Sequence, residues 1–106
     1  MAAGPVKHVV LFRFKTGTPN EKIRELIEIY KSLPGKIEIM KHFEWGSDVS
    51  VEELNDGFTH CFITTFDNAE GRDTYLPHPE HKKYVDVLFP HLDKVLVLDY
   101  VPEVIK

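Results

Sequence analysis

Hydrophobic and polar residues alternate in four short segments of this chain, and this two-residue period is typical of half-buried β-strands. The predicted strands span residues 6–14, 40–45, 58–66 and 92–101. The third shows the alternation most clearly. One face would carry Phe58, His60, Phe62, Thr64 and Phe66, and the other would carry Thr59, Cys61, Ile63 and Thr65. The first and last strands are apolar on both faces near their centres, so we expect both of their faces to be covered.

A helical period replaces the alternation between residues 18 and 33. Apolar residues recur there every three or four positions and predict one buried stripe: Ile23, Leu26, Ile27, Tyr30 and Leu33. Thr18 is the expected N-cap, Pro19 the first helical residue, and Glu21 the partner that completes a capping box. Pro34-Gly35 should end this helix. The polar segment 46–57 is compatible with a helical turn at 50–54 and a tight turn at 55–57.

A second helical region is interrupted by two prolines. Asp67 is its expected cap, and Tyr75 lies at the end of its first part. Pro77 and Pro79 cannot both lie inside one helix, because each lacks an N–H donor and constrains the residue before it. We therefore predict a new helix that starts at Pro79, with His78 in the capping position, and ends near residue 89.

His81 falls in the first turn of that second helix, on the stripe that continues with Val85 and Leu88. The N-terminal end of a helix disfavours a positive charge, and partial burial acts in the same direction. Both effects favour a neutral imidazole, which can accept a proton as a general base. Tyr75 could orient a substrate across the break. A packed histidine that bonds only to backbone is the alternative interpretation.

The order of the elements, β-α-β-β-α-β, predicts an α+β protein with a ferredoxin-like fold. Right-handed crossovers give a four-stranded antiparallel sheet of order 4-1-3-2, with the helices on one face. The other face would expose an apolar patch: Val9, Leu11, Cys61, Ile63, Leu96 and Leu98. We therefore expect a homodimer in which two sheets pack face to face.

The same topology brings the start of the first strand beside the end of the last. His8 and Asp99 are expected to hydrogen-bond under the helices, and the carboxylate would favour a protonated imidazole. His60 should lie at the opposite end, near Phe14.

Length and charge limit the function. The chain has 106 residues, which suits one domain spanning 1–106, and its net charge of −4 argues against nucleic acid as a partner. Neither a basic amphipathic helix nor a long apolar run indicates a membrane, so we expect a cytoplasmic protein. The single cysteine, Cys61, is expected to be a buried, inert thiol.

Several segments together resemble the stress-responsive A/B barrel domain (Dabb) family over nearly the whole chain. They are Val6-Lys7-His8-Val9-Val10, Trp45-Gly46-Ser47-Asp48-Val49, Gly57-Phe58-Thr59-His60, His78-Pro79-Glu80-His81 and residues 93–100. The resemblance implies a dimeric α+β barrel. Members include plant stress-induced proteins and a polyketide cyclase that closes a linear poly-β-keto thioester by an intramolecular aldol step without a cofactor.

Carried over residue by residue, the resemblance implies His81 as catalytic base and Tyr75 as the group that binds the carbonyl. The residues expected to contact a substrate are His8, Val10, Phe12, Leu26, Ile27, Tyr30, Phe43, Phe62, His78, Val97 and Asp99. Leu26 and Ile27 stand where the cyclase has phenylalanines, so its alkyl-tail specificity does not transfer.

Two functions remain open at this point. One is a dimeric stress or defence protein that binds a small apolar or aromatic ligand without turnover. The other is a cofactor-independent cyclase or related lyase. Further alternatives are other chemistry of dimeric barrels, such as oxygenation without a cofactor, and a metal shared by His78 and His81 at i, i+3 spacing.

Overall fold

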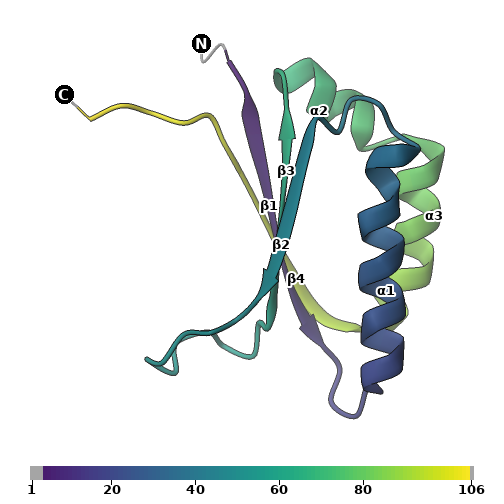
Figure 1. Ribbon diagram of the computed structural model, residues 1–106. Coiled ribbons are helices and arrows are strands. Elements are labelled where there is room, and N and C mark those ends of the chain that lie inside the picture. Colours follow the sequence, from purple (N-terminus) through teal and green to yellow (C-terminus); the bar gives the residue numbers. More distant parts are fainter. Residues whose placement is uncertain (1–3, 106) are drawn as a thin grey trace.

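The computed structural model describes residues 4–105 and has two layers, a twisted sheet and a layer of helices (Figure 1). The elements in chain order are β1 (Val6–Phe14), α1 (Asn20–Ser32), β2 (His42–Ser47), β3 (His60–Phe66), α2 (Ala69–Tyr75), α3 (Pro79–Leu88) and β4 (Leu92–Tyr100). Short 3-10 turns follow α1 (Leu33–Gly35) and α3 (Phe89–His91). The predicted ferredoxin-like α+β fold is confirmed.

Strand β1 lies at the centre of the sheet and pairs antiparallel with both β3 and β4. The strand order is β2-β3-β1-β4, as predicted. His8 lies opposite Thr64 on one side and Asp99 on the other, and Val10 lies opposite Phe62 and Val97 in the same way. Because alternate residues share a face, these side chains all point toward the helices.

The helices cover that face and bury a largely aromatic core. Its members come from every layer of the fold: Val10, Phe12, Leu26, Ile27, Tyr30, Leu33, Ile37, Met40, Phe62, Phe66, Tyr75, Tyr84, Leu88 and Leu92. The rings of Tyr30 and Phe62 stack with their centroids 4.6 Å apart, which ties α1 to β3. The predicted stripe of α1 is therefore the face that packs on the sheet, with Ile23 at its partly exposed end.

Two predicted caps are wrong. Thr18 donates its hydroxyl to the carbonyl of Lys15, 2.6 Å away, and α1 begins after Pro19 without a side-chain cap, so there is no capping box with Glu21. For α2 the cap is Asn68, whose side chain accepts from the amide of Gly71 at 2.9 Å. In α1 the Thr18 hydroxyl is used in the preceding turn and the N-cap position falls on Pro19, whereas in α2 the residue after Asp67 takes the capping position, because capping depends on backbone geometry as well as residue type.

Smaller differences concern β2 and the segment that follows it. The strand begins at His42 rather than residue 40, and the segment 50–54 has bends at 51–53 instead of a helical turn. The predicted turn at 55–57 is present, since the amide of Phe58 donates to the carbonyl of Asn55. Gly57 has φ +78°, a value that favours glycine.

The face of the sheet opposite the helices is uncovered in the single chain (Figure 1). Leu96 and Leu98 on β4 are 44% and 66% exposed, and Val9, Leu11 and Ile63 beside them are only partly covered. Cys61 lies on this outer face and is partly exposed rather than buried, while burial and the nearby Glu44 raise the pKa of its thiol. Within residues 4–105, no helix is long and apolar enough to span a membrane.

Candidate functional site

A cavity of about 170 Å3 lies between strands β1 and β4 on one side and helix α3 on the other. The side chains around it are mostly apolar, with two histidines and three tyrosines among them. The full lining is His8, Val10, Phe12, Tyr30, Tyr75, Leu76, His81, Tyr84, Val85, Leu88, Phe89, Val95 and Val97. The half-exposed side chains of Phe89 and Val97 mark its open side.

His81 is positioned by the proline break. Pro79 begins α3, and the His78 ring caps the helix by accepting from the amide of Glu80 at 3.1 Å, as predicted. This start places His81 in the first turn, half-buried, with Nδ1 2.8 Å from the carbonyl oxygen of Leu76. A carbonyl oxygen can only accept, so Nδ1 must carry the proton. In the neutral ring Nε2 is then the nitrogen with a free lone pair.

The surroundings of His81 favour its neutral form. Burial lowers the pKa of this imidazole, the hydrogen bond to the Leu76 carbonyl opposes that shift in part, and the neighbouring His8 and His78 make smaller contributions that lower the pKa. The expected neutrality of this ring thus has burial as its main cause. The structure also combines the two interpretations of this histidine, because the ring bonds to backbone through one nitrogen and still lines the cavity.

Three buried phenols surround the cavity. The ring centroid of Tyr75 lies 4.4 Å from that of His81 and 5.8 Å from that of His8, so this phenol contacts both imidazoles. Burial raises the pKa of Tyr75 to about 12 and also raises the pKa values of Tyr30 and Tyr84 well above the ordinary value of a phenol. All three therefore stay protonated at physiological pH and can donate a hydrogen bond. Tyr84 donates to the carbonyl of Leu26 at 2.8 Å, which joins α3 to α1.

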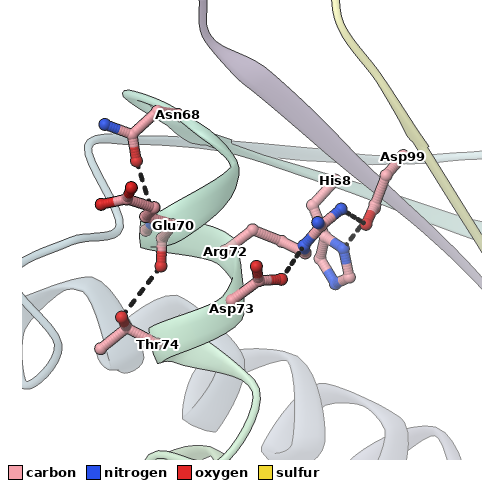
Figure 2. A network of polar contacts seen from close by, with 8 residues as sticks. His8, Asn68, Glu70, Arg72, Asp73, Thr74 and Asp99 are labelled. Atoms are coloured by element: carbon pink, nitrogen blue, oxygen red, sulfur yellow. Dashed lines mark hydrogen bonds and ion pairs between the residues drawn. The ribbon is translucent and has the colours of Figure 1, made fainter. Parts of the chain in front are cut away.

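An ion-pair network joins the cavity residue His8 to strand β4 and helix α2 (Figure 2). The predicted His8–Asp99 contact is present, with His8 Nδ1 2.6 Å from Asp99 Oδ1. The second oxygen of Asp99 accepts from Arg72 Nη1 at 3.0 Å, and Arg72 Nε donates to Asp73 at 2.8 Å. The sequence interpretation did not include Arg72, which comes from α2 rather than from either strand. As expected, His60 lies at the far end, 5.5 Å from Phe14 between ring centroids.

The predicted site residues divide into two groups. Those that line the cavity are His8, Val10, Phe12, Tyr30, Tyr75, His81 and Val97, and Asp99 reaches it through His8. Those that do not line it are Leu26, Ile27, Phe43 and Phe62, which pack in or against the core, and His78, which caps α3. The lining residues missed were Leu76, Tyr84, Val85, Leu88, Phe89 and Val95. Val85 and Leu88 share the stripe of His81, so that spacing was the available signal.

A metal shared by His78 and His81 gains no support from the donor set. His78 Nδ1 accepts from the amide of Glu80, so the neutral His78 ring carries its proton on Nε2, and only His81 keeps Nε2 free for a metal. In the described part of the chain, no group of three or more His, Cys, Asp or Glu side chains is placed to hold a metal ion.

The chain is similar to known proteins over most of its length. The chain is 50% identical over 101 residues to the stress-response A/B barrel domain-containing protein HS1 of Arabidopsis thaliana, covering 95% of this chain and 93% of that protein. It is 33% identical over 97 residues to olivetolic acid cyclase of Cannabis sativa, covering 92% and 96% of the two chains.

Solved structures extend the comparison. Hydroxynitrile lyase from Passiflora edulis superposes with a TM-score of 0.90 at 29% identity, over 99% of this chain and all of that one. A protein from Bacteroides fragilis described as dimeric, of unknown function and with a ferredoxin-like fold, superposes with a TM-score of 0.72 at 26% identity, over 91% and 94% of the chains. Residues 6–102 match the family described as the stress responsive A/B barrel domain (Dabb), and the chain therefore belongs to that family.

Proposed function

We propose that this protein binds a small, mainly apolar carbonyl compound in the cavity and, without a cofactor, moves a proton on it through His81. The observation that carries the proposal is the fixed tautomer of that ring. Its Nδ1–H is held by the Leu76 carbonyl at 2.8 Å, and Nε2 remains free on a neutral, half-buried imidazole beside the Tyr75 phenol. A base and a neutral donor next to each other suit deprotonation beside a carbonyl group.

The reaction needs only proton transfers. His81 Nε2 takes a proton from the carbon next to a carbonyl, while Tyr75 donates a hydrogen bond to the oxygen on which negative charge develops. The resulting enolate carbon can attack a second carbonyl of the same molecule, and the new alkoxide then takes the proton back from the imidazolium. This sequence of proton transfers is the aldol closure of a linear poly-β-keto thioester, and the 33% identity to olivetolic acid cyclase supports this reaction.

The reverse direction uses the same groups. When the imidazole takes the proton of a hydroxyl group, the adjacent carbon–carbon bond breaks and the carbonyl forms. The imidazolium then returns that proton to the leaving carbanion. The likeness to a hydroxynitrile lyase supports this carbon–carbon lyase chemistry as part of the same proposal.

The size of the cavity limits the ligand. An apolar cavity of about 150 Å3 holds one benzene molecule, and the cavity here has a volume of about 170 Å3. We therefore propose a compound with one ring, or an open chain that folds to that size.

We also propose that the active form is a homodimer through the outer face of the sheet. Leu96 and Leu98 leave an apolar face that a second sheet of the same chain would cover, and the dimeric relative of the same fold supports that occupant. A twofold arrangement would bury this apolar face in both subunits and leave no apolar surface for further association.

A second candidate is a stress protein that binds such a ligand without turnover. The higher identity to the Arabidopsis stress-response protein, 50% against 33% for the cyclase, favours it.

One experiment separates the two candidates. The protein is tested for binding and conversion of one-ring aldehydes, their hydroxynitriles and linear poly-β-keto thioesters. His81→Asn keeps a donor for the Leu76 carbonyl but removes the base, and His91→Asn, outside the cavity, is the matched control. We expect conversion by the wild type and the control and a loss of about 100-fold or more in His81→Asn. Binding without conversion in all three would favour the second candidate, and no binding would refute both.

A further inference from the structure

Arg72 links helix α2 to strand β4 through a carboxylate that also holds a cavity residue. Its Nη1 lies 3.0 Å from Asp99 Oδ2, while Oδ1 of the same carboxylate lies 2.6 Å from His8 Nδ1. Figure 2 shows the guanidinium and the imidazole meeting Asp99 from two different elements. Both carboxylate oxygens therefore have a partner, and neither partner can move without affecting the other.

The guanidinium is held from a second side. Arg72 Nε donates to Asp73 at 2.8 Å, so Arg72 is anchored to its own helix as well as to β4. The Arg72 and Asp99 side chains are each about three-quarters buried, and that of His8 is almost fully buried. A charge pair in this setting is less screened and more directional than one on an open surface.

Hydrogen bonds also connect Arg72 to His81 through the backbone of Leu76. The carbonyl of Arg72 accepts from the amide of Leu76 at 3.2 Å, and the carbonyl of Leu76 accepts from His81. Tyr75 lies three residues after Arg72, at the end of the same helix. Because α2 has only seven residues, it has little stability of its own and depends on tertiary contacts.

We propose that Arg72 is a positioning residue that fixes His8 through Asp99 and pins the end of α2 that carries Tyr75 and the Leu76 carbonyl. By occupying Oδ2, it keeps Oδ1 of Asp99 in line with His8 Nδ1. The proton of a neutral His8 then stays on Nδ1, and Nε2 is the free nitrogen on the cavity side of the network. The inference rests on the proposed function for its catalytic meaning, but the positioning itself is a property of the free protein.

The test uses long-range 1H–15N spectra of the histidine side chains, recorded at about pH 8, where an ordinary imidazole is neutral. They report which ring nitrogen of His8 carries the proton. Amide hydrogen exchange of residues 72–76 reports how firmly α2 is held. The variants are Arg72→Met, which removes the charge but keeps a long apolar chain, and Arg72→Lys, which restores the charge. Arg24→Met is the matched control at an exposed arginine on α1.

We expect the wild type, Arg24→Met and, in large part, Arg72→Lys to show His8 protonated on Nδ1. Arg72→Met should show a mixture of the two tautomers and an increase of about tenfold in α2 exchange, while exchange in β1 and β3 stays within about twofold. An unchanged His8 tautomer with unchanged α2 exchange in Arg72→Met would overturn the proposal. So would an equal rise in exchange throughout the chain, since that indicates only lower global stability.

These readouts need no substrate, so they separate this inference from the proposed function. If no carbonyl compound reacts, the proposed function fails, and the spectra still decide whether Arg72 positions His8. If the wild type converts a substrate, an unchanged turnover rate in Arg72→Met would show that the positioning of His8 by Arg72 does not contribute to catalysis.

Discussion

Thr64 carries a buried hydroxyl with no hydrogen-bond partner, and its replacement by valine should stabilise the protein. The residue lies on β3 between His8 of β1 and Phe43 of β2, and it is 0% exposed. Within residues 4–105, its Oγ1 has no partner. Burial raises the pKa of the nearby Tyr30 phenol, and the Thr64 hydroxyl opposes this only slightly, since no hydrogen bond of good geometry joins the two groups. A native hydrogen bond requires good alignment, so the Thr64 hydroxyl is unpaired.

The size of the effect follows from the burial. An unpaired hydroxyl in an apolar environment costs about 1–3 kcal/mol, and valine has nearly the same shape. We expect Thr64→Val to gain about 1 kcal/mol in the free energy of unfolding, at the low end of that range because the Tyr30 hydroxyl is near. This corresponds to a rise of about 4–8 °C in the unfolding temperature of a domain of this size.

The neighbouring residue provides a matched control. Thr65 is also buried, but its Oγ1 accepts from Lys7 Nζ at 2.9 Å. The same substitution, Thr65→Val, should therefore cost about 0.5–1.5 kcal/mol. Urea unfolding of the wild type and both variants at one fixed protein concentration measures the differences, and the fixed concentration removes any effect of association. A loss of stability in Thr64→Val as large as that in Thr65→Val would refute the reasoning.

Two further predictions concern His81 and the outer face. Because burial lowers the pKa of His81 in the native state, the unfolded chain takes up the proton first, and stability should fall as the pH drops below about 6.5. Urea unfolding between about pH 8 and 5 checks this, and His81→Asn should weaken the dependence; a protein that grows more stable on acidification contradicts the assignment. Leu98→Glu, at a residue 66% exposed on the outer face, should shift sedimentation toward the monomer, whereas Val87→Glu on the helix layer should not. Identical sedimentation of both variants would argue against a dimer through this face.

Residue types and their spacing were sufficient to predict which elements carry the polar residues of the site. Pro77 and Pro79 cannot share a helix, so the break, the cap at His78 and the place of His81 in the first turn all followed from residue types. The two-residue period of the strands likewise gave the face of each side chain. With the topology, it placed His8 beside Asp99, although they lie 91 residues apart.

What only the tertiary structure decided is which side chains border empty space and which atoms hold the polar groups. Ile27 and Phe62 point into the layer between the sheet and the helices, as the cavity residues do. They pack closely against other core side chains and therefore do not border the cavity. The contacts of Arg72 with Asp99 and of His81 with the Leu76 carbonyl depend on ångström-level placement of α2 against the sheet and α3. Sequence spacing determines the direction of a side chain within its own element, whereas the distances between elements follow from how all their side chains pack together.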